Sequence, residues 1–307
     1  MKKPLINIAV CTCQRLKLLR ICLASLVEMS LPEGVEVCLS VIDNDVEGSA
    51  RDLIAEFADG CHFAIYYVHQ PKRGIPVARN TAVEKAHALN ADYLVFIDDD
   101  EWVEVDWLLN LYAYAMEVGG DKVISGAVCP EVPADVPEHL AKLFVMKERR
   151  TGTRLETCAT NNVMIPSFVT RDIGMRFDES QPLAGGTDTL FFLAAAAKGV
   201  VILKCAEALV HELIPPGRVS LGWLWRRKYR VGITLAGRRQ QQGRGVHGLF
   251  LSSIVKVLGH GLVALAWVVI WQPLLRNKAT LKAARDMGVV VGCLGGRIDS
   301  YSTVDGQ

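Results

Sequence analysis

Three consecutive carboxylates, Asp98-Asp99-Asp100, directly follow the apolar run Tyr93–Ile97. The run has the length and composition of a buried β-strand, so the carboxylates lie where a hydrophobic strand leaves the core. Desolvating several like charges together is unfavourable or raises their pKa values. A divalent cation removes this conflict, because carboxylate oxygens are preferred ligands of Mg²⁺ and Mn²⁺. The feature therefore predicts a site for Mg²⁺ or Mn²⁺, with the acidic first turn of a helix near Glu104 as the alternative.

Composition narrows the class of protein. The 307 residues are 50% hydrophobic and 22% charged, which suits one large α/β domain or two smaller ones and excludes wholesale disorder. The net charge of +1 gives no reason to expect a nucleic-acid partner. The nine cysteines are scattered without a CxxC pair, so free thiols are expected rather than disulfides or zinc ligands. The N-terminal segment is too short for a secretory signal, so this part is expected in the cytoplasm.

Strand and helix patterns alternate over the first part of the chain. Near-continuous apolar strands separated by helices predict a mostly parallel sheet with helices on both faces. Ligands of such sheets bind beyond the carboxyl ends of the strands. Thr12, Asp43 and Asp98 all follow predicted strands, so we expect them to converge on one crevice. The predicted strands are Leu5–Cys11, Val35–Ile42, Ala64–Val68, Tyr93–Ile97 and Val123–Val128, and the predicted helices are Leu16–Leu26, Val77–Leu89 and Trp107–Val118.

The pattern is looser between Pro130 and Glu156, where several prolines interrupt it. Further strands are predicted at Cys158–Ile165 and Val200–Leu203. Between them, the turn residues Gly185-Gly186-Thr187-Asp188 precede an apolar helix over Leu190–Ala197.

The C-terminal part combines a basic stretch with an apolar one. Arginines and a lysine crowd the sequence after Pro215-Pro216, and an apolar segment then runs over Leu249–Leu275 and contains Trp267 and Trp271. Its best window is shorter than the roughly 20 residues of a membrane span, so an interfacial or re-entrant helix competes with a spanning one. A core helix of a soluble domain is the other alternative. Cationic flanks and tryptophans favour association with the cytoplasmic side of the inner or plasma membrane, peripherally or through one C-terminal segment.

Five short motifs occur in an order that resembles family 2 glycosyltransferases with the GT-A fold, over about residues 6–232. The family usually has Pro and Asn where this chain has Cys11 and Gln14, and Glu where it has Thr187. The whole pattern is most similar to single-sugar transferases of bacterial polysaccharide and lipopolysaccharide assembly. The motifs are Val10–Arg15, Val41–Asn44, Gly74–Asn80, Phe96–Asp100 and Gly185–Thr189.

The resemblance implies an inverting transfer of one sugar from a nucleotide-diphosphate sugar, with a UDP-sugar as the expected donor and a lipid-linked or polysaccharide hydroxyl as acceptor. A Q-x-x-R-W motif, which processive members carry, does not occur, so a single addition is expected. The implied organisation is a GT-A-like catalytic domain over 1–240, with a nucleotide-sugar half over about 1–128 and an acceptor half over about 129–240. Residues 241–307 form an apolar and basic membrane-associating region.

Roles for single residues follow from the resemblance. Asp98 and Asp100 are expected to hold the cation on the departing diphosphate. His211 is a further candidate metal ligand, although a lone histidine is usually structural. Arg226 and Arg227 are expected to contact diphosphate or lipid head groups, with a solvated helix face as the alternative. The complete set of candidate substrate-binding residues is Thr12, Arg15, Asp43, Arg79, Asn80, Asp99, Arg226 and Arg227.

Two of these expectations have local alternatives. Asp43 would accept a hydrogen bond from the base or ribose, or it would merely form the turn after its strand. Arg79 would contact the donor, or it would pair with the acidic cluster.

Asp188 is the candidate general base. An inverting transfer needs a carboxylate that takes the proton of the acceptor hydroxyl as its oxygen attacks the anomeric carbon. The alternative is a helix cap for a helix beginning at Thr189.

Two other functions remain open from the sequence. A sugar nucleotidyltransferase would share the layout and the metal site but favours a glycine-rich phosphate loop, whereas Cys11–Arg15 contains no glycine. A non-catalytic sugar-binding protein would share the fold but has no need of Asp98, Asp100 and Asp188.

Overall fold

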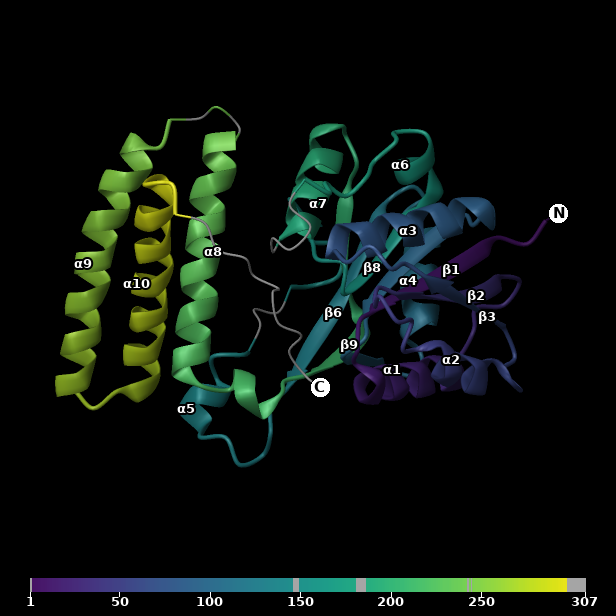
Figure 1. Cartoon of the computed structure of the whole chain (residues 1–307), viewed down its shortest axis with the longest axis horizontal. Coiled ribbons are helices and arrows are strands. Elements are labelled where there is room, and N and C mark those ends of the chain that lie inside the picture. The colour runs from purple at the N-terminus through teal and green to yellow at the C-terminus, as the bar shows by residue number, and fades with distance from the viewer. Residues whose placement is uncertain (1, 146–148, 181–185, 242, 244, 297–307) are drawn as a thin grey trace.

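The computed structural model describes residues 2–145, 149–180, 186–241, 243 and 245–296. Figure 1 shows an α/β part built on a twisted sheet and, beside it, three long helices that run side by side. The N-terminus lies at the side of the α/β part that is away from these helices.

The first four long strands form a parallel sheet. Strand β1 (Leu5–Thr12) lies between β2 (Glu36–Asp43) and β4 (Tyr93–Asp98), and β3 (Ala64–His69) lies beyond β2. All of these pairs are parallel. Thr12 pairs with Asp43 and Cys11 with Asp98, so the strands end at the same level.

The rest of the sheet is mixed, so the expected parallel arrangement holds as far as β4 and then changes. Strand β8 (Asn162–Pro166) is antiparallel to both β4 and β6 (Val123–Glu131). Strand β9 (Ile202–Leu213) is parallel to β6. Two short strands, β5 (Glu101–Val103) and β7 (Arg154–Leu155), are antiparallel to β9.

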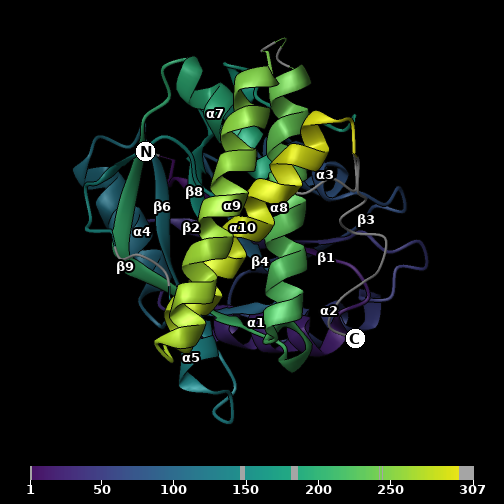
Figure 2. The same cartoon turned by 90° about the vertical axis from the view of Figure 1, so that its left-hand side faces the viewer.

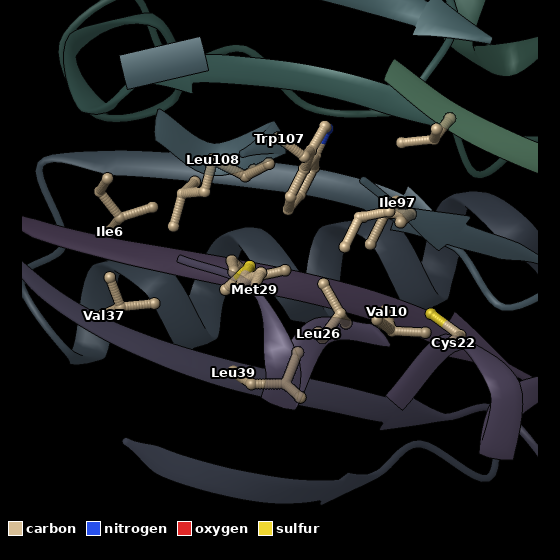
Figure 3. Packing of buried hydrophobic residues seen from close by; sticks show 14 of the residues in the cluster. Ile6, Val10, Cys22, Leu26, Met29, Val37, Leu39, Ile97, Trp107 and Leu108 are labelled. Carbon is tan, nitrogen blue, oxygen red and sulfur yellow. The ribbon is translucent and has the colours of Figure 1, made fainter. Parts of the chain in front are cut away.

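Helices cover both faces of the sheet, as the sequence predicts. Buried residues of α1 (Leu16–Glu28), α2 (Arg51–Ala58) and α4 (Trp107–Glu117) pack on one face. Those of α3 (Ile75–Ala88), α6 (Ser167–Arg171) and α7 (Thr187–Ala197) pack on the other. Figure 3 shows the first face, where Trp107 and Leu108 of α4 lie with strand residues such as Ile6 and Ile97. Alternation of side chains along each strand supplies both faces with apolar groups.

The C-terminal helices form a bundle. Helix α10 (Pro273–Cys293) lies against both α8 (Leu221–Gln241) and α9 (His247–Val269) (Figures 1 and 2). Glycines bring α8 and α10 into backbone contact: a Cβ atom on Gly288 would lie 2.0 Å from the carbonyl oxygen of Tyr229. A Cβ atom on Gly232 would lie 2.0 Å from the carbonyl oxygen of Arg285. The short helix α5 (Glu138–Ala141) lies at one end of the bundle and contacts α10.

Helix α9 is apolar and mostly exposed. Its most apolar 18 residues have a mean hydropathy of 1.8 and only 6% of them are buried. Within the described ranges, it is the one helix whose length and composition would allow it to cross a membrane. The expected apolar segment over Leu249–Leu275 is therefore a helix, a turn at Trp271 with φ +56°, and the start of α10. Exposed apolar residues on α9 are Leu251, Ile254, Val255, Leu258, Leu262, Val263, Leu265, Val268 and Val269.

Candidate active site

The structure brings the predicted strand-end residues to one edge of the sheet. Because β1, β2 and β4 are parallel and in register, Thr12, Asp43 and Asp98 all lie at their carboxyl ends. Strand β1 begins at the side away from the helical bundle, so this edge faces the bundle (Figure 1). The edge is where ligands of parallel sheets bind.

Arg15 cross-links the acidic cluster. Its Nη1 atom lies 2.5 Å from Oδ1 of Asp99 and its Nη2 atom lies 2.6 Å from Oδ2 of Asp100. The hydroxyl of Thr12 donates a hydrogen bond of 2.8 Å to the other oxygen of Asp99. Gln14, at φ +56°, turns the chain between β1 and α1 and so places Arg15 over the carboxylates. Thr12 and Arg15 therefore reach the predicted site, where they hold Asp99 and Asp100 in place.

The cluster holds more negative charge than its partners neutralise. Burial raises the pKa of Asp98, and the charges of Asp100 and Asp188 raise it further. Burial also raises the pKa of Asp99 to about 7. Glu101 is 1% exposed, and burial beside Asp98 holds its pKa well above the usual range. Such shifts mark carboxylates that lack sufficient positive charge nearby.

The free oxygens of this cluster fit a hard divalent cation. Among the described residues, no hydrogen bond or ion pair engages the carboxylate of Asp98, whereas Asp100 is engaged through Oδ2 alone. An all-carboxylate set with uncompensated charge suits Mg²⁺ or Mn²⁺ better than the softer transition metals. Asp98 and Asp100 therefore remain the candidate ligands.

Cations from the far end of the chain approach the same carboxylates. Arg218, in a 3₁₀ turn over Pro216–Arg218, has Nη1 3.6 Å from Oδ2 of Asp100. Burial and the charge of Asp100 raise the pKa of Glu212, and Arg227 opposes this shift. The guanidinium carbons of Arg218 and Arg227 lie 5.8 and 5.4 Å from the ring centroid of Trp223. Arg227 is thus near the cluster, whereas Arg226 has no such contact in the part of the chain that is described, although both residues are exposed.

Arg218 and Glu212 were not among the predicted site residues. Arg218 belongs to the basic stretch after Pro215-Pro216, but nothing in that stretch distinguishes it from its neighbours. Only the pairing of β9 with β5 and β6 shows that this segment returns to Asp100.

The structure does not bring His211 to Asp98 and Asp100. Successive side chains of a strand point to opposite faces, and in β9 it is the neighbouring Glu212 that faces Asp100. The ring nitrogens of His211 lie 2.7 Å from Oε1 of Glu131 and 2.7 Å from Oε1 of Glu104. The ring is stacked on Trp102, with centroids 5.1 Å apart. His211 therefore belongs to a polar cluster with Glu104 and Glu131, apart from the contacts of Asp98 and Asp100, and its role as a metal ligand stays a prediction.

Asp43 and Asn44 order the loops at the crevice. Asp43 is fully buried and its Oδ2 accepts hydrogen bonds from the Ala50 amide (2.8 Å) and the Tyr67 hydroxyl (3.1 Å). Asn44 donates to the carbonyl oxygens of Gln70 and Lys72 and accepts from the Gly74 amide, each at 2.8 Å. These contacts favour the loop-forming alternative for Asp43, and Asn44 fixes the start of α3.

Arg79 and Asn80 connect α3 to α7 and to the segment 177–179. Nη1 of Arg79 donates to the hydroxyl of Thr187 at 3.3 Å, and its charge opposes the raised pKa of Asp98. The Asn80 side chain exchanges two hydrogen bonds of 2.9 Å with the backbone of Phe177 and donates a third, of 2.8 Å, to Glu179. Arg79 therefore lies between the acidic cluster and α7, while Asn80 holds the 177–179 segment.

Asp188 lies in the first turn of α7. The helix begins at Thr187, two residues earlier than expected, after Gly186 at φ +81°. Oδ1 of Asp188 accepts a hydrogen bond of 2.8 Å from the Thr189 amide. The charge of Asp188 raises the pKa of Asp98, so the two carboxylates are within electrostatic reach of one another. Gly185, part of the same motif, is outside the described residues.

Comparison with known proteins agrees with this geometry. Residues 7–168 match the sequence model of glycosyl transferase family 2. The chain is 34% identical over 301 residues to the succinoglycan biosynthesis protein ExoM of Rhizobium meliloti (strain 1021). This alignment covers 94% of this chain and 93% of that protein. It is 28% identical over 107 residues to the putative glycosyltransferase EpsH of Bacillus subtilis (strain 168), covering 35% of this chain and 29% of that protein.

The fold is similar to that of S. aureus TarS 1-349, solved in complex with UDP-GlcNAc. The TM-score is 0.54 at 15% identity, with 98% of this chain and 95% of that chain covered. The architecture is therefore the GT-A-like α/β fold that the motifs implied, with a mixed sheet. This chain therefore belongs to glycosyl transferase family 2, because residues 7–168 match the family and a 34% identical relative aligns over nearly its whole length.

Proposed function

We propose that the chain is an inverting, divalent-metal-dependent transferase that moves one sugar from a UDP-sugar to a hydroxyl of a lipid-linked or polysaccharide acceptor. The observation that carries the proposal is a set of three carboxylates: Asp98, whose carboxylate no described residue engages, and Asp100 and Asp188, whose charges both act on it. The relative's role in succinoglycan biosynthesis and the neighbour's complex with UDP-GlcNAc support the acceptor and donor classes. Membership of the family favours this function over a nucleotidyltransferase or a non-catalytic protein.

On the donor side, Asp98 and Asp100 would hold the cation, which would neutralise charge on the departing diphosphate. Arg15 keeps Asp99 and Asp100 fixed, so the ligand oxygens need little reorganisation when the donor binds. Arg218 and Arg227 supply positive charge beside the cluster, where a diphosphate would lie. Asp99 has both oxygens engaged by Thr12 and Arg15, so its role would be to position these groups.

On the acceptor side, Asp188 would take the proton of the attacking hydroxyl. Its Oδ1 is fixed by the Thr189 amide, and Oδ2 has no hydrogen-bond partner among the residues that the structure describes. A carboxylate held through one oxygen presents the other in a defined direction, as a general base requires. Arg79 donates to Thr187, the neighbour of Asp188, and lowers the pKa of Asp98, so it would supply positive charge between the two carboxylates.

We further propose that α9 lies along the cytoplasmic surface of the membrane rather than across it. Helix α9 packs along α10, which carries Arg276, Lys278, Lys282 and Arg285, and α10 packs on the arginine-rich α8. A spanning α9 would take these charges toward the bilayer, at about 2.5–3.5 kcal/mol for each charge near its centre. An in-plane helix buries its exposed apolar side in lipid and leaves the charged neighbours in water.

The substitution Asp188→Asn tests the catalytic proposal. Asparagine keeps the acceptor for the Thr189 amide, so the melting temperature and the affinity for UDP-sugar should stay near those of the unchanged protein. Transfer should fall by about 10² to 10⁴, the usual contribution of a positioned base. Asp172→Asn, an exposed carboxylate at the end of α6, is the matched control and should retain full activity.

The configuration of the product is an independent measurement. An α-linked UDP-sugar should give a β-linked product, observed by NMR of the isolated saccharide. Near-normal specific activity in Asp188→Asn, or a retained configuration in the product, would overturn the proposed mechanism.

A further inference from the structure

A groove of about 650 Å³ opens between the segment that follows α5 and the helices α8 and α10. This end of the bundle, where α5 meets the lower part of α10, is visible in Figure 2. The volume lies within the range of small-molecule sites. Five cationic and four aliphatic side chains line the groove: Lys142, Lys228, Lys278, Lys282 and Arg285, and Leu143, Val145, Leu274 and Leu281.

The described residues of this groove do not neutralise its positive charge. No carboxylate is among the lining residues that the structure describes. Lys142 has a partner outside the groove in Glu138 and Arg285 has one in Asp286, whereas Lys228, Lys278 and Lys282 make no ion pair within the described part of the chain. Burial and the neighbouring charges of Arg227 and Arg285 lower the pKa of Lys228. Cations gathered in this way attract an anion, because like charges at close range are unfavourable.

The groove also has an apolar side. Leu281 is 7% exposed, and Leu143 and Leu274 are half-buried. A free inorganic anion would gain nothing from these residues, whereas an amphiphile with an anionic head would contact both kinds of lining.

The position of the groove links it to α9. Residues 274–285 of α10 follow directly after the turn that ends α9. At that turn, Val269 and Trp271 are 85% and 86% exposed. The apolar end of α9 and the cationic groove therefore lie at the same end of the bundle, which is the arrangement expected at the level of lipid head groups.

We propose that this groove binds the phosphate head group of an anionic glycerophospholipid of the membrane surface, whose acyl chains extend along the exposed side of α9. The charge of the groove matches the phosphate, and its aliphatic lining matches the glycerol and the first methylenes. The inference rests on the proposed membrane association, and it adds a defined binding site and a preference for anionic lipid.

Sedimentation of the full-length protein with vesicles tests the preference. Vesicles of phosphatidylcholine with one third phosphatidylglycerol should bind the unchanged protein much more tightly than vesicles of phosphatidylcholine alone. The double variant Lys278→Gln/Lys282→Gln should bind the anionic vesicles about 25-fold more weakly, since each lysine near such a surface contributes roughly fivefold. The control Lys2→Gln/Lys3→Gln removes the same charge at the opposite end of the molecule and should change binding little.

Short-chain lipid below its micelle concentration separates a defined site from diffuse attraction. Dihexanoyl-phosphatidylglycerol should raise the melting temperature of the unchanged protein, and the effect should be absent in Lys278→Gln/Lys282→Gln. Dihexanoyl-phosphatidylcholine and inorganic phosphate should have little effect. Equal stabilisation by inorganic phosphate would show a site for free anions and overturn the proposal.

The vesicle experiment also distinguishes this proposal from the membrane association on which it rests. A protein that sediments with no vesicle would refute both. Equal binding to neutral and anionic vesicles, lost in Leu262→Gln/Leu265→Gln on the exposed side of α9, would keep the membrane association and refute the groove.

Discussion

The contact between α8 and α10 can be tested by replacing Gly288 with alanine. The added Cβ atom would lie 2.0 Å from the carbonyl oxygen of Tyr229 and 2.8 Å from its carbonyl carbon. Ordinary contact between a carbon and a carbonyl oxygen needs about 3.3 Å or more, so the helices would have to separate by about 1 Å. Both obstructing atoms belong to the backbone and cannot rotate away. Separation of the helices would also loosen the neighbouring contacts of Gly232 and Gly292.

The expected cost follows from two opposing effects. Overpacking a close contact destabilises by about 1–3 kcal/mol, and a backbone obstruction belongs at the upper end of this range. Alanine is the better helix former by about 1 kcal/mol, which offsets part of the cost. Gly288→Ala should therefore lower the free energy of unfolding by about 2 kcal/mol.

Gly237→Ala provides the matched control. Gly237 lies in α8, and a Cβ atom on it would meet no atom within 4 Å, so only the gain in helix propensity remains. This variant should be more stable than the unchanged protein by about 0.5–1 kcal/mol. Urea unfolding followed by circular dichroism would measure both. If Gly288→Ala proves at least as stable as Gly237→Ala, α8 and α10 are not in backbone contact and this reasoning is wrong.

Three further substitutions test the site and its surroundings. Asp98→Asn should weaken Mn²⁺-dependent binding of UDP, measured by calorimetry, by about tenfold or more, and unchanged affinity in EDTA would contradict the metal site. Asn80→Ala removes three hydrogen bonds and should lower the free energy of unfolding by about 2–3 kcal/mol. If the urea midpoint of this variant is unchanged, these bonds contribute nothing to stability. Burial lowers the pKa of His211, but Glu131 and Glu104 outweigh this and raise it overall. The stabilisation by protonated His211 is thus present below about pH 6.5 and lost as the pH rises through the raised pKa, so His211→Gln should reduce the urea midpoint at pH 5.5 and hardly at pH 9.

The sequence was sufficient to predict the parallel half of the sheet, because each of its strands is an apolar run that ends abruptly at a polar residue. Each apolar run is a buried strand and each following polar residue lies at its carboxyl end, so Thr12, Asp43 and Asp98 converge as predicted. The direction of later strands carries no such signal, since an apolar run reads the same in either direction. That is why the antiparallel pairing of β8 and the short strands β5 and β7 were not foreseen.

The place of His211 could not be derived from the sequence, for a specific reason. The sequence predicts a strand at Val200–Leu203, where the structure has the longer strand β9. Between Lys204 and Leu209 the register with β6 shifts by several residues at Ser125 and Ala127. A register shift changes which side chains of a strand face the core. The alternation of the sequence therefore does not show that Glu212 points toward Asp100 and His211 away from it.

Residue type also predicts chemistry better than it predicts partners. Asp43 and Asn80 have the donors and acceptors for a nucleotide contact, yet the structure shows them holding the backbone of neighbouring loops. Arg15 was expected at the donor and is found bridging two carboxylates. The partners of Arg15 are 84 and 85 residues away along the chain, and the Phe177 backbone is 97 residues from Asn80, so both lie beyond the reach of local patterns.

Helix α8 connects the crevice with the proposed membrane site. The charge of Arg227 lowers the pKa of Glu212 beside the acidic cluster, and its neighbour Lys228 lines the cationic groove. Consecutive residues of a helix are about 100° apart, so one turn of α8 can serve both surfaces. Because α8 is in backbone contact with α10, a head group in the groove would fix the orientation of α8 and, with it, the position of Arg227. Docking on an anionic surface would therefore orient the crevice toward acceptors held at that surface, and it would do so without a contact between the lipid and the carboxylates.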